Sequence, residues 1–269
     1  MEFGVAIRNM GPQSDPDTIL RCVQAAEERG FESAWVVDHI AIPPDDAEGS
    51  NGRYLDPLTT LAWLAGATSR IKLGCSVLIL PYRPPLPTAK VVATLQELSG
   101  NRLLLGVGVG WMTAEFKALG VPRGERGRRT DETLDFLHRC FAADEVEAHG
   151  QRFLFRPRPA RPPILIGGKG PHALARVIRF GDAWLPMPAP LEELQADCAR
   201  LAELASEAGR APPGLTLLGR LGTDSAGDGR VLEGYRALGA QRVIAATRYA
   251  DADACMRWLD ALVALREQG

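Results

Sequence analysis

An acidic residue and a histidine stand side by side in the stretch VVDHI, where Asp38 and His39 end an apolar run of strand length. An imidazole changes its charge near neutral pH, so a histidine at a strand end can exchange a proton with a bound substrate. A carboxylate that caps a strand beside a half-exposed histidine would look the same. We take Asp38 and His39 as the candidate catalytic pair, because no other histidine lies at such an obvious strand end.

Three glycines alternate in the stretch LLLGVGVGWMTAEF, residues 103–116. Side chains alternate between the two faces of a strand, so Gly106, Gly108 and Gly110 would leave one face without side chains. Glycine inside a strand often marks the close approach of a ligand or of another backbone. The spacing lacks the G-x-x-G step of a dinucleotide fingerprint. Two explanations stay open: a tight corner of the barrel, or room for a flat ligand ring.

A second glycine cluster lies in the stretch LIGGKGPHALARV, where Gly167, Gly168, Lys169 and Gly170 lead into a predicted helix that Pro171 can begin. The backbone N–H groups at a helix start, the positive end of the helix dipole and the lysine charge together favour a phosphate. A plain loop at the start of a helix is the alternative.

A third candidate is the pair Ser76 and Val77 in the stretch CSVLILPYRPP. A small residue beside a β-branched one would let a flat ring lie against the backbone. Val77 and its apolar neighbours could equally be ordinary residues of a barrel core.

Strand-length apolar runs, each followed by a stretch of helical periodicity, must position these residues. The predicted strands are residues 3–7, 33–38, 71–80, 102–109, 163–168, 182–186, 215–221 and 242–248. The predicted helices are residues 18–29, 58–68, 88–98, 113–118 with 129–141, 172–180, 191–208, 232–238 and 252–265. Gly30, Gly100, Gly181 and Gly239 lie where helices should stop, which suits the left-handed position at a helix end.

This alternation predicts an α/β fold, a single (β/α)8 TIM barrel over residues 1–269, rather than a doubly wound sheet. Residues 144–163 break the rhythm, since a short alternating run, a glycine turn and several prolines form an excursion between units four and five. Active sites of such barrels lie at the carboxyl ends of the strands. The candidate residues fall at the ends of the second to fifth strands.

Composition limits the kind of partner. The chain is 46% hydrophobic and 24% charged with a formal net charge of −2, which excludes a disordered chain and gives no basic face for nucleic acid or an anionic membrane. The N-terminus lacks the pattern of a signal peptide, and no apolar run has the length of a membrane span, so we expect a cytoplasmic protein with a small-molecule substrate. Five scattered cysteines predict neither a disulfide framework nor a metal site.

The chain resembles the luciferase-like monooxygenase superfamily of TIM barrels, and more narrowly the branch that uses the deazaflavin coenzyme F420. The resemblance lies in AEERGFESAWVVDHI, in the block PYRPPLPTAKVVATLQELSGNRLLLGVGVGWMTAEFKALGV, in ERGRRTDETLDFL and in RPPILIGGKGPHALARVIRFGDAWLP. It runs from the first strand to about Pro186, and the last eighty residues match only in general pattern. A bacterial-luciferase-like barrel is therefore implied, and we expect a homodimer.

The resemblance also implies roles for the candidate residues. Asp38 and His39 would lie beside the deazaflavin ring, and the Ser76–Val77 bond would be a non-prolyl cis peptide against it. Gly106, Val107, Gly108 and Gly110 would flank the ring, so that the missing side chains leave room for it and for main-chain hydrogen bonds. The cofactor phosphate would lie at Gly167, Gly168, Lys169 and Gly170. Relatives that oxidise sugar phosphates carry a glutamate where this chain has Trp111, so Trp111 implies an apolar wall for a flatter, less charged substrate.

The leading hypothesis is hydride transfer between C5 of F420 and an enone, imine or similar acceptor, with His39 handling the proton. An FMN-dependent monooxygenase that uses oxygen is the second hypothesis. A non-catalytic deazaflavin carrier is a third, and a Schiff-base aldolase that uses Lys169 is a fourth. Arg83, Arg220 and Arg248 are candidates for contacts with the polyglutamate tail of F420.

Overall fold

Eight parallel strands close into a barrel within residues 1–267, the part of the chain that the computed structural model describes. Around the barrel the order is β1-β10-β9-β8-β7-β4-β3-β2. The strands are β1 (Glu2–Ala6), β2 (Ser33–Val36), β3 (Lys72–Ile79), β4 (Leu103–Gly108), β7 (Ile164–Gly167), β8 (Ala183–Leu185), β9 (Gly214–Arg220) and β10 (Arg242–Ala246). The predicted TIM barrel is confirmed.

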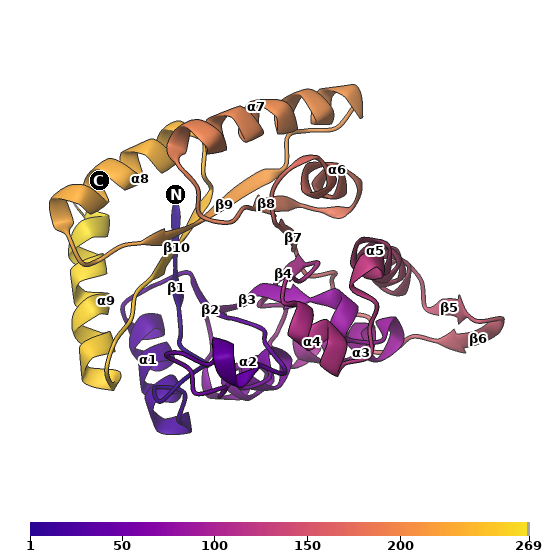
Figure 1. Cartoon of the computed structure of the whole chain (residues 1–269), viewed down its shortest axis with the longest axis horizontal. Helices are drawn as coiled ribbons and strands as arrows, with labels where there is room; N and C mark the ends of the chain where they lie inside the picture. Colours follow the sequence, from indigo (N-terminus) through magenta and orange to yellow (C-terminus); the bar gives the residue numbers. More distant parts are fainter. Residues whose placement is uncertain (268–269) are drawn as a thin grey trace.

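Helices follow the barrel strands and cover the outside of the barrel (Figure 1). They are α1 (Pro16–Glu28), α2 (Pro57–Ala67), α3 (Pro85–Leu98), α4 (Thr113–Ala118), α5 (Arg126–Ala142), α6 (Pro171–Phe180), α7 (Leu191–Glu207), α8 (Ser225–Ala237) and α9 (Ala252–Glu267), with 3-10 turns η1 (Pro44–Asp46), η2 (Leu80–Tyr82) and η3 (Arg123–Glu125). None of the helices formed by residues 1–267 has the length and apolarity needed to cross a membrane.

Short sequence signals set the ends of the helices. Asp15 accepts a hydrogen bond from the Thr18 N–H and caps α1, and Asp56 caps α2 in the same way. Gly30 has φ 71°, so it occupies the left-handed position expected after α1. The same prediction is wrong for Gly181, whose φ is −92°. A Cβ there would lie 2.8 Å from Ile166 Cγ1, so close packing, not a turn, explains that glycine.

The excursion between the fourth and fifth units is an antiparallel hairpin of β5 (Glu145–Ala148) and β6 (Gln151–Leu154). Its turn is formed by His149 and Gly150, which both have positive φ. The hairpin projects from the barrel beside α5 (Figure 1). It therefore adds a surface feature to the barrel without changing the order of its strands, as the sequence predicted.

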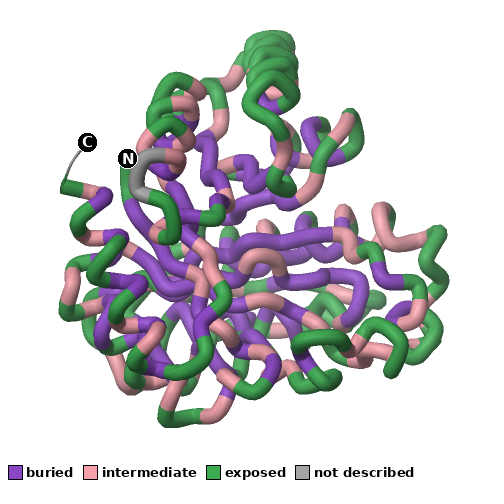
Figure 2. The backbone as a smooth tube through the Cα atoms, turned by 60° about the vertical axis from the view of Figure 1, so that its left-hand side comes forward, coloured by how far each residue is buried: buried purple, intermediate pink, exposed green. Residues whose placement is uncertain are grey.

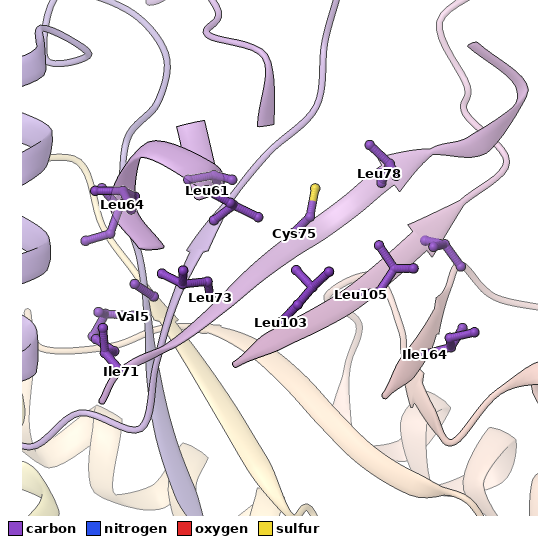
Figure 3. Close-up of a cluster of buried hydrophobic side chains, with 14 of the residues drawn as sticks. Val5, Leu61, Leu64, Ile71, Leu73, Cys75, Leu78, Leu103, Leu105 and Ile164 are labelled. Atoms are coloured by element: carbon purple, nitrogen blue, oxygen red, sulfur yellow. The ribbon is translucent and has the colours of Figure 1, made fainter. Parts of the chain in front are cut away.

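Most residues of the barrel strands are buried (Figure 2), and hydrophobic side chains pack on the outer and the inner faces of the strands. Outside the strands, Leu61 and Leu64 of α2 face Leu73 of β3 and Leu103 of β4 (Figure 3). Inside the barrel lies a smaller cluster of Trp35, Leu104, Leu165, Leu185 and Ile244, with Val77 packed on it.

Trp35 fills the interior because its neighbours have no side chains. A Cβ at Gly74 of β3 would overlap the Trp35 indole, and one at Gly4 of β1 would lie 2.6 Å from Trp35 Nε1. The indole N–H donates to Ser33 Oγ at 2.8 Å, so its polar atom is satisfied inside the barrel. The barrel is thus a packed core, and ligands can enter only at its ends.

At the opposite end of the strands from the candidate residues, Glu32 links the starts of three strands. It precedes β2 and contacts Lys72 at the start of β3 and Arg242 at the start of β10. Its carboxylate accepts hydrogen bonds from Arg242 at 2.6 and 2.8 Å and from Lys72 at 2.8 Å. Burial alone would raise the pKa of Glu32, but its ion pair and hydrogen bonds with Arg242, together with those from Lys72 and Ser33, outweigh burial and lower the pKa from 4.5 to about 2. Because the pKa of Glu32 is lower in the folded protein, its ionised carboxylate stabilises the fold at pH values above the unfolded pKa of 4.5. This stabilisation is lost as the pH falls from 4.5 toward 2.

We therefore expect Glu32→Gln to lower the free energy of unfolding at pH 7 by about 3 kcal/mol, the equivalent of that pKa shift. The difference from the parent should shrink as the pH falls below about 4.5, which urea unfolding at several pH values would measure. Glu145→Gln is the control, because Glu145 pairs with Arg152 on the exposed hairpin and should change stability little. An equal, pH-independent loss in both variants would contradict this assignment.

Candidate active site

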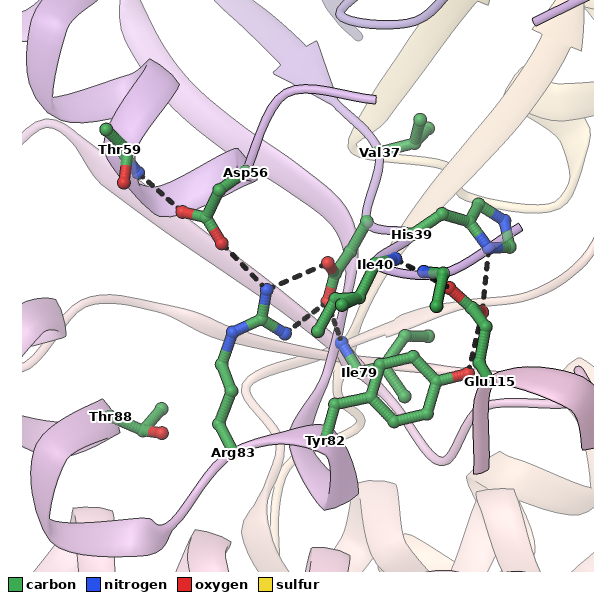
Figure 4. Close-up of polar contacts among 12 residues, drawn as sticks. Val37, His39, Ile40, Asp56, Thr59, Ile79, Tyr82, Arg83, Thr88 and Glu115 are labelled. Atoms are coloured by element: carbon green, nitrogen blue, oxygen red, sulfur yellow. Dashed lines mark hydrogen bonds and ion pairs between the residues drawn. The ribbon is translucent and has the colours of Figure 1, made fainter. Parts of the chain in front are cut away.

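The carboxyl ends of β2, β3 and β4 bring four charged or polar side chains together at one mouth of the barrel (Figure 4). His39 follows β2, Tyr82 and Arg83 lie in and after η2, and Glu115 lies in α4. Figure 4 shows two linked groups of contacts, one around Glu115 and one around Arg83. The sequence predicted His39 as a catalytic residue and Arg83 as a contact for a cofactor tail, and it gave no signal for Tyr82 or Glu115.

The carboxylate of Glu115 is the centre of the first group. It is fully buried, and its Oε1 accepts from the backbone N–H groups of Ile40 at 2.6 Å and Ala41 at 3.0 Å. Its Oε2 accepts from the Tyr82 hydroxyl at 2.8 Å and lies 2.9 Å from His39 Nδ1. Four donors thus surround one carboxylate, and they tie the loop after β2 to α4.

These contacts determine the charge of Glu115. Burial alone would raise the pKa of Glu115, but the hydrogen bonds from Ala41 and Ile40, with those from His39 and Tyr82, lower it below its usual value. The pKa of Tyr82 is raised by burial and by its bond to Glu115, so Tyr82 stays a neutral donor. Glu115 is therefore an ionised acceptor.

An ionised carboxylate can only accept hydrogen bonds, so His39 Nδ1 must carry a proton. In the neutral imidazole the other nitrogen, Nε2, is then an acceptor, and in the charged form it is a donor. The His39 side chain is 19% exposed, so Nε2 has access to the mouth of the barrel. His39 has the arrangement of a proton donor and acceptor that is held in one tautomer by Glu115.

Two aromatic rings flank His39. The ring of Tyr54 meets it edge-on with centroids 4.9 Å apart, and Trp111 lies edge-on at 6.2 Å. Trp111 is 64% exposed, so its face is open to solvent or to a ligand. The structure thus places Trp111 beside His39, where it can form an apolar wall.

Asp38 belongs to the second group and is almost fully buried. Its Oδ2 accepts from the Ile79 N–H at 2.8 Å, and Arg83 donates to both of its oxygens, at 2.6 and 2.9 Å. Arg83 also donates to Asp56 at 2.9 Å. The guanidinium of Arg83 is therefore engaged by two carboxylates and is not free for a cofactor tail. Asp38 holds the end of β3 in place, and its participation in catalysis stays a prediction.

The Ser76–Val77 peptide bond is cis, as the family resemblance implied. The register between β3 and β4 shifts between Cys75 and Leu78, so the strand bulges at this bond. The side chain of Val77 is half-buried and packs on the inner cluster of the barrel. Val77 therefore forms the floor of the mouth.

The glycines of β4 make room for this bulge. A Cβ at Gly106 would overlap the carbonyl oxygen of Cys75, and one at Gly108 would lie 2.5 Å from Val77 Cγ2. The expectation that these missing side chains leave space for a ligand ring is therefore wrong at Gly106 and Gly108, because strand β3 fills the space. Gly110 has φ 77°, so a turn requires it. It stays a prediction that the main chain from Gly106 to Gly110, including Val107, contacts a cofactor.

The second glycine cluster borders a cavity of about 980 Å³. Gly168 and Gly170 have positive φ, and they turn the chain from β7 into α6. Glycine is needed at position 167 for a different reason, because a Cβ there would lie 2.7 Å from Val77 Cγ1. Cationic side chains from the turn, α5 and α6 line the cavity, namely Arg126, Arg128, Lys169, Arg176 and Arg179.

Sequence reasoning missed most of this basic lining. Two signals were available in the sequence. Arg176 and Arg179 have the spacing that puts them on one face of α6, and the stretch ERGRR is dense in arginine. Three of these cations are paired with carboxylates, Arg128 with Glu125 and Glu132, Lys169 with Glu193, and Arg176 with Asp131. Within residues 1–267, Arg126 and Arg179 are the cations of the lining that form no ion pair. A glycine turn, a helix start and the two arginines Arg126 and Arg179 suit a phosphate or a longer anionic group.

Comparison with known sequences identifies relatives over most of the chain. A model of the luciferase-like monooxygenase family matches residues 1–226. An uncharacterized protein of Mycobacterium tuberculosis is 34% identical over 208 residues, which cover 71% of this chain and 72% of that protein. The F420-dependent hydroxymycolic acid dehydrogenase of the same organism is 29% identical over 226 residues, which cover 81% of this chain and 61% of the dehydrogenase.

Solved structures have the same fold. The monooxygenase RslO1 from Streptomyces bottropensis superposes with a TM-score of 0.81 at 20% identity over the full length of both chains. The oxygenating constituent of 3,6-diketocamphane monooxygenase from Pseudomonas putida, solved with FMN, has a TM-score of 0.77 at 15% identity and covers 98% of this chain and 96% of its own. At these identities the likeness shows the barrel and no activity.

Proposed function

The chain belongs to the luciferase-like monooxygenase family, and from this premise we propose that it is an oxidoreductase that transfers a hydride between coenzyme F420 and a small organic substrate. One observation carries the proposal. His39 is held by the ionised Glu115 at the mouth of the barrel, with the exposed Trp111 edge-on to its ring. A polarised proton donor beside a flat, apolar surface is what reduction of a polar double bond requires.

The residues present fit a phosphorylated, planar cofactor. The half-buried Val77 offers a flat contact for a ring, and the main chain around Gly108 to Gly110 borders it. The turn from Gly167 to Gly170, with Lys169 and the arginines of α5 and α6, would hold the phosphate and the anionic tail. When bound there, reduced F420 supplies a hydride from its C5 carbon.

Side chains of the protein would transfer the proton and limit the access of water. His39 Nε2 donates a proton to the charge that develops on a substrate oxygen or nitrogen, or accepts one in the reverse direction. Glu115 keeps the proton on Nδ1 and so leaves Nε2 to face the substrate. Trp111 and Tyr54 shield the imidazole on two sides and limit the access of water.

FMN-dependent oxygenation is the second candidate, because the basic cavity would accept the FMN phosphate as well and because a structural neighbour carries FMN. A Schiff-base aldolase does not fit. Lys169 Nζ donates a hydrogen bond to Glu193, and this carboxylate raises the pKa of Lys169. The amine therefore stays protonated, whereas a Schiff-base lysine needs a lowered pKa.

A panel of enones, imines and ketones tests the proposal in two arms. In the anaerobic arm, the protein with reduced F420 should convert at least one acceptor, seen as the return of the visible absorption of oxidised F420. In the aerobic arm, the protein with reduced FMN should give no oxygenated product beyond the protein-free control. Oxygenated product in the second arm with no turnover in the first would favour the monooxygenase. Tight F420 binding with no turnover on any acceptor, in either direction, would favour a carrier.

A further inference from the structure

We propose that the substrate carries an anionic group, and that Arg8 and Arg248 bind this group in a second cavity at the mouth of the barrel. This inference rests on the proposed function, since it assigns the substrate end of the same site. The cavity measures about 270 Å³ and lies among the loops after β1, β2 and β10. Its size suits one small organic acid or the charged end of a larger one.

The cavity lies on the other side of the mouth from the basic cavity described above. The basic cavity borders β4 and β7, whereas the second cavity borders β1 and β10. In the closed barrel, β2 and β3 separate β4 from β1, and β8 and β9 separate β7 from β10. Arg8 and Arg248 therefore belong to a different subsite from the arginines of α5 and α6, and a cofactor phosphate in the basic cavity leaves them unoccupied.

The two guanidinium groups are available for a ligand. Arg8 Nε donates to the neutral Gln13 Oε1 at 3.2 Å, and Arg248 is exposed. Neither arginine forms an ion pair with a side chain within residues 1–267, in contrast to Arg83 at the same mouth, which is engaged by two carboxylates. Glu48 is the acidic residue in the lining, so the cavity has an excess of positive charge. Two arginines with open donor groups match the geometry of a carboxylate or phosphate.

The walls of this cavity are held before a ligand arrives. The backbone N–H of Arg8 donates to the Tyr249 hydroxyl at 2.8 Å, and the Tyr249 ring stacks on Trp258. The buried side chain of Asn9 donates to the carbonyls of Val37 and Leu55, so it joins the loop after β1 to the loop after β2. A preformed site loses little conformational freedom on binding, which favours affinity.

Tyr54 connects the cavity to the candidate proton donor. It lines the cavity and meets His39 edge-on, with ring centroids 4.9 Å apart. A substrate held by its anionic group at Arg8 and Arg248 would extend past Tyr54 toward His39 and the Val77 floor. The substrate is therefore charged at one end and apolar at the end that meets Trp111.

Benzoate and its neutral isostere benzamide test this inference by calorimetric titration of the protein without cofactor. At low ionic strength, benzoate should bind at least about tenfold more tightly than benzamide, and Arg8→Met or Arg248→Met should remove this preference. Arg230→Met is the matched control, because Arg230 is exposed on α8 and outside both cavities. It should keep the preference of the parent. Equal binding of the two probes by the parent, or a preference that survives in the Arg8→Met Arg248→Met double variant, would overturn the inference.

These outcomes are independent of the proposed function, because calorimetry of these probes requires neither F420 nor turnover. If F420-dependent turnover is found but benzoate shows no arginine-dependent preference, the inference fails and the function stands. If benzoate binds as expected but F420 does not bind, the proposed function fails and the cavity remains an anion site.

Discussion

Replacement of His39 by alanine should lower turnover with reduced F420 by about 10²–10⁴, the usual span for the loss of a positioned acid or base. The proposed function makes Nε2 of His39 the proton donor at the mouth, and the tautomer of His39 is set by an ionised carboxylate 2.9 Å from Nδ1. Cofactor affinity should change far less, because the proposed phosphate cavity lies at β4 and β7. Steady-state kinetics on an acceptor found in the panel, with a fluorescence titration of F420, measures both quantities.

Two further variants make this prediction specific. Glu115→Gln keeps the shape of the side chain and removes its charge, so we expect a loss of turnover smaller than that of His39→Ala. His149→Asn is the control, because His149 lies in the turn of the β5–β6 hairpin at positive φ, which asparagine tolerates. It should match the parent. If His39→Ala stays within about threefold of the parent across the pH range, the proton comes from solvent or another residue and the assignment is wrong.

Gly106→Ala should destabilise the protein by more than about 2 kcal/mol, because the new methyl group would overlap a backbone atom in a packed interior. The Cβ would meet the carbonyl oxygen of Cys75, which cannot move without disturbing the pairing of β3 with β4. Chemical denaturation followed by circular dichroism measures the loss.

Gly66→Ala provides the matched control for this substitution. Gly66 lies near the end of α2 with no atom within 4 Å of the position of a Cβ, so alanine there should leave stability unchanged or raise it by up to about 1 kcal/mol. A Gly106→Ala variant that is as stable as the parent and loses only cofactor binding would restore the original explanation, in which the glycine leaves room for a ring.

The barrel could be predicted from the sequence because its signals are local. Strand runs, helical periodicity and glycines such as Gly30 each involve a few consecutive residues. The stretches that resemble the luciferase-like family also predicted the cis peptide bond before Val77. The excursion was recognisable for the same reason, since its turn at His149 and Gly150 interrupts the alternation.

The polar network could not be predicted because its partners are distant in the sequence. Glu115 is 76 positions from His39, and Arg83 is 45 positions from Asp38. No periodicity links such residues, and a buried glutamate in a short helix looks like a solvated one. The cause of the β4 glycines was missed in the same way, because the atom that excludes a Cβ at Gly106 belongs to β3. Only the pairing of the strands reveals it.

Equilibrium titration of the protein with F420 and with FMN, followed by visible absorption or fluorescence, tests the central claim most directly. Both cofactors offer a ring and a phosphate, but the polyglutamate tail of F420 adds negative charge that the arginines of α5 and α6 can attract. F420 should bind at least about tenfold more tightly than FMN at low ionic strength, and this difference in affinity should narrow as salt is added. Equal affinities, or tighter binding of FMN, would contradict the assignment of the protein as an F420-dependent oxidoreductase.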